Sequence, residues 1–472
     1  MPPLATDHDA IKAIDTDHVW HPFTPMRWWR DADTLTIERA DGFRLFDTEG
    51  RGHIDGNASL WCNVHGHRVR ELDAALTAQL DRVAHTTMLG LTSVPATDLA
   101  KRLVAIAPGE MRHEKAKVFY SDAGATAVEV AMKIARGHHW YRGDTQRDTF
   151  IGIHGAYHGD TSGSMSIGFD RHLHDPFKPL TFPCQWATCP APCMHETRQE
   201  SSVWPSRDES TRARSLRDAL ADMDRLLDQF EGRVAGVVIE PLVQGAAGIV
   251  EHPNGYLRAV AEMAKDRGAL LIADEVAVGF GRTGAMFACE HEDVTPDILC
   301  LGKGISGGYL PLAATIVREG IASSFDGEHG EYRTLFHGHT YTGNPLACAT
   351  AIASLDLFQR DDVLANANRI GAAMRSRIER DLASHPNVAD VRGRGVMIGV
   401  ELVRSRSPFE RFDRTDRVAY RVCDLARERG AIVRPIGDVL ILNPAPAMDG
   451  ATAMELAEIL VDSVNAFDFN AV

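Results

Sequence analysis

The sequence predicts an α/β protein with a mostly parallel central sheet, accompanied by a smaller α+β unit. Stretches of helical periodicity alternate with short apolar runs of strand length, which is typical of a buried parallel sheet covered by helices. The helical stretches cover residues 70–83, 94–106, 125–141 and 254–267. The apolar runs cover residues 117–120, 150–154, 234–240, 269–274, 298–301 and 313–317.

The two ends of the chain differ from this middle part. Residues 36–56 alternate apolar and polar side chains around Asp-Gly and Glu-Gly turn signals, and predict a small antiparallel meander. Helical patterns return after residue 346, and residues 431–442 predict a strand pair before a last helix from Ala451. We expect a large domain at residues 70–345 and a small domain built from residues 1–69 and 346–472.

Composition argues against several classes of partner. The 472 residues carry 50 Lys and Arg against 65 Asp and Glu, a net charge of −15, whereas nucleic acids and anionic membranes attract basic surfaces. No apolar run approaches the roughly 18 residues of a transmembrane helix. The N-terminus lacks the cationic and apolar parts of a signal peptide, and eight scattered cysteines are typical of a reducing compartment. We therefore expect a cytoplasmic protein.

Residues 184–214 are rich in Cys, Pro, Ser and Arg, and predict a long irregular excursion over the surface. Cys184, Cys189 and Cys193 have irregular spacing and no fourth ligand nearby, so we favour no metal site there. The histidines of the His-Gly-His sequences at residues 65–67 and 337–339 are expected to line or shape the pocket rather than to bind metal.

Three features follow predicted strands at their carboxyl ends, where open α/β sheets bind ligands. Residues 121–126 form a small-residue loop that opens a helix, which suits an anion, although ordinary packing is the alternative. Asp274 and Lys303 each end an apolar run. A desolvated lysine has a lowered pKa and is a better nucleophile, but the two residues could instead form a simple buried ion pair.

The segment Gly279-Phe280-Gly281-Arg282-Thr283-Gly284 matches the dinucleotide pattern G-x-G-x-x-G. Such a fingerprint opens a helix directly after its strand. Here five residues intervene after Asp274, and the residues that follow are poor helix formers. A nicotinamide-dependent oxidoreductase is therefore a weaker hypothesis.

A lysine, an acid and an anion-binding helix together suit pyridoxal 5′-phosphate. This cofactor needs a lysine for its covalent link, an acid opposite its ring nitrogen and a site for its phosphate. An acid that keeps the ring nitrogen protonated makes the ring an electron sink.

The sequence resembles the class III, fold-type I, pyridoxal-phosphate aminotransferases over residues 18–445. The resemblance implies that fold, a homodimer with active sites shared between subunits, and small-molecule substrates. The motifs that carry it are AYHGDT at residues 156–161, EPLVQGAAG at 240–248, ADEVAVGFGRTG at 273–284, LGKGISGGYLP at 301–311 and HGHTYTGNPLACA at 337–349.

The resemblance implies a role for several residues around the cofactor. Lys303 resembles the lysine that links to the cofactor and moves the proton, and Asp274 resembles the partner of the ring nitrogen. Gly124 and Ala125 match the phosphate-binding pair, although the second residue is commonly serine. Tyr157 matches the ring that stacks on the cofactor.

The remaining implied residues lie further from the reacting atoms. Glu240 matches a carboxylate close to the cofactor, and Thr340 matches the phosphate ligand supplied by the neighbouring subunit. Trp61 and Gly338 match parts of the substrate pocket. Arg434 resembles the arginine that grips the substrate carboxylate.

Within the class, three segments are most similar to the branch that aminates 8-amino-7-oxononanoate in biotin biosynthesis, with S-adenosylmethionine or lysine as amino donor. They are residues 18–26, 59–67 and 337–349. Phe23 and Leu60 depart from one part of that branch and leave the donor open. Ile441 replaces an arginine of relatives that use glutamate. A broad amine or ω-amino acid:pyruvate aminotransferase is the alternative, and a non-catalytic scaffold is disfavoured because Lys303 and Asp274 are present.

Overall fold

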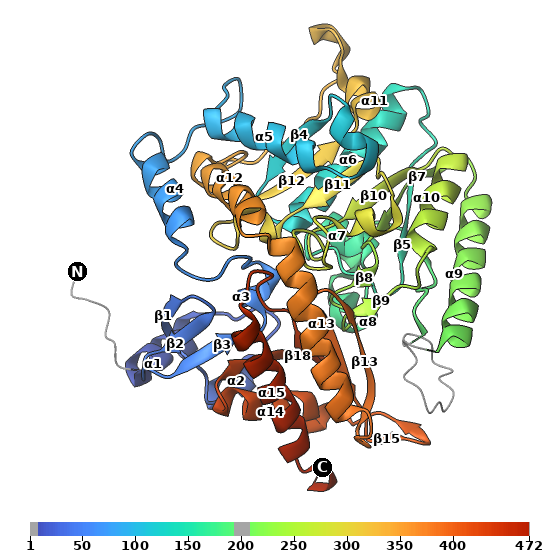
Figure 1. Cartoon of the computed structure of the whole chain (residues 1–472). Coiled ribbons are helices and arrows are strands. Elements are labelled where there is room, and N and C mark those ends of the chain that lie inside the picture. The colour runs from blue at the N-terminus through green and yellow to red at the C-terminus, as the bar shows by residue number, and fades with distance from the viewer. Residues whose placement is uncertain (1–7, 193–207, 472) are drawn as a thin grey trace.

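A computed structural model describes residues 8–192 and 208–471 of the chain. Its centre is a seven-stranded sheet, visible in the upper half of Figure 1, in which only one strand runs opposite to the rest. The sheet order is β4 (Lys117–Ser121), β12 (Ala313–Val317), β11 (Ile298–Leu301), β10 (Leu270–Asp274), β7 (Val234–Ile239), β5 (Thr149–Ile153) and β6 (Gln185–Ala187). The antiparallel strand is β12, so the predicted α/β class with a mostly parallel sheet is confirmed.

Helices cover both faces of this sheet, and its central strands are therefore buried along their whole length. One face packs against α6 (Gly124–Tyr141), whose Ala127, Ala131 and Ala135 are fully buried. The other face packs in one continuous core with α5 (Val94–Ile106), α9 (Glu209–Gln229), α10 (Tyr256–Asp266) and α12 (Pro345–Arg360).

The two ends of the chain lie together below the central sheet in Figure 1, as the meander and the C-terminal helices. The meander β1 (Ile37–Asp41), β2 (Arg44–Asp47) and β3 (Gly52–Asp55) is extended by β17 (Ala431–Ile432), which runs parallel to β3. Ile54 is fully buried in the core formed by the C-terminal residues. The shared sheet and core are consistent with one small unit made from both ends; the exact domain boundaries stay a prediction.

A second sheet completes this unit, in the order β13 (Val388–Arg394), β14 (Met397–Leu402), β19 (Val439–Leu442) and β18 (Arg434–Ile436). It packs with α13 (Val363–Leu382), α14 (Val418–Glu428) and α15 (Gly450–Ala466). The remaining elements are short or peripheral: α1 (His8–His18), α2 (Met26–Asp31), α3 (Ala58–Trp61), α4 (Arg70–Leu80), α7 (Ser162–Ile167), α8 (Arg171–His174), α11 (Glu319–Ala322), β8 (Val243–Gln244), β9 (Val250–Glu251), β15 (Ser405–Arg406) and β16 (Phe409–Glu410).

The prediction of a surface excursion over residues 184–214 is wrong at both of its ends. Residues Gln185–Ala187 form the edge strand β6, paired with β5, and Cys184 and Cys189 are each only 4% exposed. From Glu209 the chain is helical, because the side chain of Asp208 caps the first turn of α9. Three residues are too few to show an alternating pattern, so β6 left no signal in the sequence. Cys193 lies outside the described residues.

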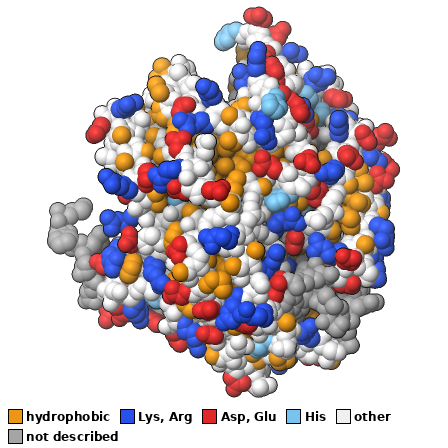
Figure 2. Space-filling model, viewed as in Figure 1, with side chains coloured by type: hydrophobic (Ala, Val, Ile, Leu, Met, Phe, Trp, Pro, Cys, Tyr) orange, Lys and Arg blue, Asp and Glu red, His pale blue; other side chains and the backbone are white. Residues whose placement is uncertain are grey.

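The surface carries charges of both signs. Figure 2 shows acidic and basic side chains intermixed over this face. Across the part of the chain that the structure describes, no helix has the length and apolar character needed to span a bilayer.

Candidate active site

The three predicted strand-end features meet at one edge of the central sheet. Strands β10 and β11 are parallel neighbours, so Asp274 at the end of β10 and Lys303 just beyond β11 leave the sheet on the same side. A side chain built on Gly302 would lie 3.4 Å from the backbone nitrogen of Gly124, the first residue of α6. The lysine, the acid and the helix N-terminus are therefore adjacent.

Lys303 has an unusual environment. Its backbone has a φ of 43°, a left-handed conformation that residues other than glycine rarely adopt. Its Nζ lies 5.5 Å from the ring centroid of Trp61. Burial lowers the pKa of Lys303, although the charges of Asp274 and Glu240 oppose that shift.

Asp274 is 3% exposed and accepts two hydrogen bonds. Its Oδ2 accepts from Nδ1 of His158 at 2.7 Å, and its Oδ1 accepts from the backbone nitrogen of Val276 at 3.0 Å. Among the described residues, Asp274 and Lys303 form no ion pair within 4.0 Å. The simple buried ion pair considered from the sequence is therefore wrong.

His158 is a site residue that sequence reasoning missed. Burial disfavours its charged form, but the hydrogen bond and the charge of Asp274 outweigh burial and raise the pKa of His158. Its Nε2 is buried without a partner. The signal was available, because His158 stands beside Tyr157 in the AYHGDT motif.

Glu240 and Tyr157 form the next layer of the site. Glu240 is 3% exposed and accepts from the backbone nitrogens of Tyr157 and Gly245, both at 2.9 Å. Burial raises the pKa of Glu240 to about 7. The hydroxyl of Tyr157 donates to Oδ2 of Asp160 at 2.6 Å, so burial and this carboxylate raise the pKa of Tyr157. Asp160 was also missed from the sequence.

The predicted phosphate loop forms the start of α6. Gly124 is required here, because a side chain would lie 2.4 Å from Cγ1 of Val276. Ala125 is in close contact with Gly159, where a Cβ would lie 2.3 Å from that of Ala125. The first backbone N–H groups of a helix have no partner within the helix, so the start of the 18-residue α6 is suited to bind an anion.

Of the predicted substrate residues, Trp61 is buried, whereas Arg434 and Gly338 are exposed, as is the predicted phosphate ligand Thr340. Trp61 is buried near Lys303 and packs over Gly245, where a Cβ would lie 2.8 Å from the indole ring. Arg434 opens β18 with an exposed side chain, directly opposite the buried Ile441. Gly338 and Thr340 lie on an exposed segment, and within the described chain the hydroxyl of Thr340 makes no hydrogen bond.

The glycine-rich segment 279–284 forms turns and is followed by no α-helix before β11. Arg282 is 1% exposed and donates to carbonyl oxygens of Asn63 at 2.8 Å and Pro444 at 2.7 Å. Gly281, with φ +83°, packs against the side chains of Phe358 and Leu364. This segment therefore joins the two units of the fold. The hypothesis of a dinucleotide site is not supported, because such a fingerprint opens a helix and no α-helix follows the segment before β11.

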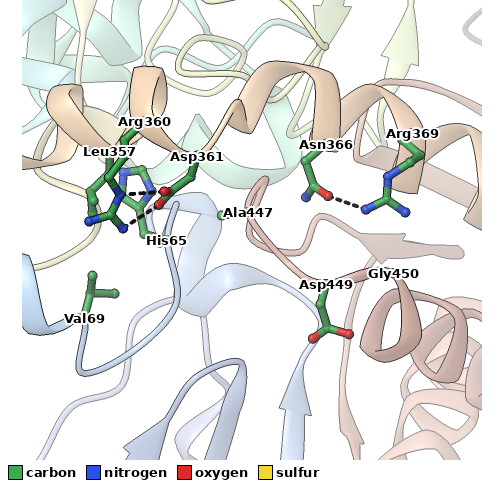
Figure 3. A pocket seen from close by; sticks show the side chains of 10 residues that line it. All are labelled: His65, Val69, Leu357, Arg360, Asp361, Asn366, Arg369, Ala447, Asp449 and Gly450. Carbon is green, nitrogen blue, oxygen red and sulfur yellow. Dashed lines mark hydrogen bonds and ion pairs between the residues drawn. The ribbon is translucent and has the colours of Figure 1, made fainter.

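A cavity of about 410 Å³ lies elsewhere, between α12, α13 and the turn before α15 (Figure 3). His65 lines this cavity, and none of the residues discussed at the strand ends does. Its lining residues are His65, Val69, Leu357, Arg360, Asp361, Asn366, Arg369, Ala447, Asp449 and Gly450.

The residues at the strand ends fit pyridoxal phosphate. Lys303 supplies an amine with a lowered pKa, Asp274 supplies a carboxylate that is not paired with it, and α6 supplies beside both its first N–H groups, which have no partner within the helix. Glycines at positions 124 and 302 keep side chains out of the space between them.

Known proteins similar to this chain are aminotransferases. The family model described as aminotransferase class-III matches residues 28–464. A protein of Nitratidesulfovibrio vulgaris named adenosylmethionine-8-amino-7-oxononanoate aminotransferase is 46% identical over 453 residues, which cover 94% of this chain and 79% of that protein.

Solved structures lead to the same family. The crystal structure of adenosylmethionine-8-amino-7-oxononanoate aminotransferase from Methanocaldococcus jannaschii gives a TM-score of 0.89 at 39% identity, covering 98% of this chain and 100% of that one. An amine transaminase from an uncultivated Pseudomonas species, solved with pyridoxal phosphate bound, gives a TM-score of 0.87 at 32% identity, covering 95% and 98%. The chain therefore belongs to the class-III aminotransferases.

Proposed function

We propose that this aminotransferase binds pyridoxal 5′-phosphate and uses it to convert 8-amino-7-oxononanoate to 7,8-diaminononanoate. The observation that carries the proposal is the arrangement of Lys303 and Asp274 at adjacent strand ends, close to the start of α6 and not paired with each other. When bound, the cofactor supplies an electron sink for the bond that breaks at the amine-bearing carbon.

Each residue contributes a separate task. Lys303 would hold the cofactor covalently and would move a proton, for which a lowered pKa is an advantage because the neutral amine is the base. Asp274, held by His158 and by the nitrogen of Val276, would be the partner of the ring nitrogen. The N–H groups of Gly124 and Ala125 bind the phosphate. Tyr157, whose hydroxyl donates to Asp160, would stack on the cofactor ring.

The substrate assignment is supported by the names of the relatives and by two side chains. The exposed guanidinium of Arg434 is available to hold the carboxylate of a keto acid in a bidentate fork. The buried Ile441 opposite it offers no second arginine for a dicarboxylate such as 2-oxoglutarate. Relatives named adenosylmethionine-8-amino-7-oxononanoate aminotransferase favour S-adenosylmethionine as the amino donor, with lysine as the other candidate.

A homodimer with shared active sites is part of the proposal. Thr340, which would bind the phosphate of the neighbouring subunit, is exposed, and its hydroxyl makes no hydrogen bond to any of the described residues. Large hydrophobic side chains are exposed around it and on the segment before α5, including Leu89, Leu91, Tyr332 and Phe336. Patches of this kind mark protein–protein interfaces.

Two measurements test the proposal. Borohydride treatment of the cofactor-loaded protein, followed by peptide mass spectrometry, should find a pyridoxyl group on Lys303; its absence would contradict the cofactor assignment. The aminated form of the cofactor-loaded protein should then lose its absorption band when 8-amino-7-oxononanoate is added. If pyruvate discharges the band and 8-amino-7-oxononanoate does not, the protein is a broad amine:pyruvate aminotransferase instead.

A further inference from the structure

The segment that carries Thr340 is tied to the phosphate helix by a chain of four polar side chains. His339 lies at its centre, with Nδ1 2.8 Å from Oδ2 of Asp122 and Nε2 3.1 Å from Nε2 of His337. The other nitrogen of His337 lies 3.0 Å from Nζ of Lys133. The chain thus runs from Lys133 through two imidazole rings to Asp122.

The chemistry of these groups allows one consistent arrangement of protons. An ammonium group only donates, so Nδ1 of His337 accepts from Lys133 and its Nε2 carries the proton. That proton is donated to Nε2 of His339, whose remaining N–H is donated to the carboxylate of Asp122. Burial, Lys133 and His339 all lower the pKa of His337, in keeping with a neutral ring. Hydrogen bonds that all run in one direction strengthen one another.

Both ends of this chain are fixed to one structural unit. Asp122 comes directly after β4, two residues before the start of α6, and Lys133 lies within α6. The backbone around Thr340 is held as well, because His339 N donates to Oγ1 of Thr342 at 3.0 Å and Thr342 N donates to the carbonyl oxygen of His339 at 3.3 Å. An exposed threonine is therefore held in a fixed position.

We propose that Lys133, His337, His339 and Asp122 form a positioning network that sets Thr340 for the cofactor phosphate of the neighbouring subunit. This inference rests on the proposed function, since it requires the cofactor and the shared active site. The network also connects the segment around Thr340 to the phosphate-binding loop of its own subunit, because Asp122 belongs to that loop. The phosphate sites of the two subunits would then share one scaffold.

The first test uses the homodimer. His339→Phe keeps a ring of similar shape but removes both nitrogens, and we expect about tenfold weaker binding of pyridoxal phosphate, the effect of losing one hydrogen bond to a charged group. His339→Gln can still donate to Asp122 and accept from His337, so it should restore binding. His329→Phe, an exposed exchange in the preceding turn, is the matched control and should bind as the parent does.

A double mutant links the effect to Thr340. If the network acts through Thr340, Thr340→Ala alone weakens binding, and His339→Phe causes no further loss in that background. Fully additive effects of the two exchanges would contradict the proposal.

The decisive test is a hybrid dimer of one Lys303→Ala subunit and one His339→Phe subunit, purified through two different tags. The one remaining Lys303 of this hybrid lies in the His339→Phe subunit. The Thr340 that completes this active site comes from the Lys303→Ala subunit, in which the network is intact. We expect this site to bind pyridoxal phosphate as tightly as the parent and to give about half of the parent's activity, as does a hybrid of Lys303→Ala with the parent.

A hybrid site as weak as the His339→Phe homodimer would show that the network serves only its own subunit, and would overturn the proposal. If His339→Phe prevents dimer formation, Lys133→Met breaks the network at its exposed end and should behave in the same way in the hybrid. Failure of the proposed function gives a different result, because the parent protein would then carry no pyridoxyl group on Lys303 after borohydride treatment.

Discussion

At the scale of single residues, Lys303 and its neighbour Trp61 both have strained backbone conformations. Lys303 itself has φ 43°, and Ser59 and Trp61 both have φ 62°. Left-handed conformations of such residues cost on the order of 1–3 kcal/mol each and persist only where the surrounding structure imposes them. Here the strain places the amine of Lys303 and the ring of Trp61 5.5 Å apart at the proposed reaction site.

His158 is expected to govern how well Asp274 serves the ring nitrogen. His158→Leu removes the donor to Oδ2 of a buried carboxylate, so we expect kcat/KM to fall by about tenfold to a hundredfold, the effect of losing a hydrogen bond to a charged group. His158→Asn keeps a donor and should recover part of the loss. Equal kinetics for the parent and His158→Leu would contradict this role.

Gly245 is expected to set the position of Trp61. A methyl group at Gly245 would lie 2.8 Å from the indole ring, so Gly245→Ala should displace Trp61 and raise KM for the keto acid by about tenfold. Steady-state kinetics and Trp fluorescence would measure both effects. Gly320→Ala, at a position with open space around it, is the matched control and should change neither.

Residue-level prediction from sequence succeeds where a residue is defined by its place along a strand. The shared location of Lys303, Asp274 and Gly124 could be predicted because each follows an apolar run and parallel strands end at one edge of a sheet, whereas their roles stay a proposal. His158 and Asp160 lie in the same motif as Tyr157, but the motif alone does not give their contacts, because these depend on Asp274 from another strand and on the orientation of Tyr157.

At the scale of elements, the central strands could be predicted because burial on both faces makes them continuous apolar runs. Strand β10, Leu270–Asp274, lies within the predicted run and is buried along its length. Strand β6 could not be predicted, because it is three residues long and lies at the sheet edge among Pro and Cys residues. Its existence depends on tertiary pairing with β5, which the local sequence does not encode.

Arg392 in β13 connects the small unit to the loop that follows Glu240. Its guanidinium is buried, donates to the carbonyl oxygens of Gly248 and Ile249, and pairs with Asp390 and Glu401. Arg392→Met leaves two buried carboxylates without this partner, so we expect a loss of about 3–5 kcal/mol in the free energy of unfolding.

Urea unfolding of the cofactor-loaded protein measures that loss. The control is Arg233→Met, which breaks a pair with Asp148 whose two side chains are about half exposed and which should cost less than about 1 kcal/mol. Similar losses for the two variants would show that the buried ion pairs of Arg392 stabilise the fold no more than an exposed pair does.

At the scale of the whole molecule, joining the chain ends into one unit was predictable in outline, but the contacts that join it to the large sheet were not. Arg282, in a segment that resembles a dinucleotide fingerprint, reaches carbonyl oxygens at Asn63 and Pro444, far away on both sides in the sequence. Burial lowers the pKa of Arg282 to about 10. Contacts of such sequence separation have no local pattern, so only the three-dimensional fold identifies them.

The stability of the molecule is expected to depend on pH through Glu275. This residue is fully buried and accepts from the backbone nitrogens of Ala288 and Cys289, both at 2.8 Å, and burial raises its pKa from 4.5 to about 7. The unfolded chain therefore releases this proton at a lower pH than the folded chain. The stabilisation associated with the bound proton is present below pH 4.5 and is lost as the pH rises through about 7.

Glu275→Gln removes this titration while keeping the shape of the side chain. We expect the advantage of the parent over the variant in the free energy of unfolding to shrink by about 2.5 kcal/mol between pH 5 and pH 8, since each pKa unit corresponds to about 1.4 kcal/mol and part of the loss occurs below pH 5. Urea unfolding at fixed protein and cofactor concentration measures the difference at both pH values. The control is Glu262→Gln, an exposed exchange in α10, which should change the free energy of unfolding by the same small amount at both pH values. A parent–variant difference that stays constant for Glu275→Gln would mean that Glu275 remains charged in the folded protein throughout this range.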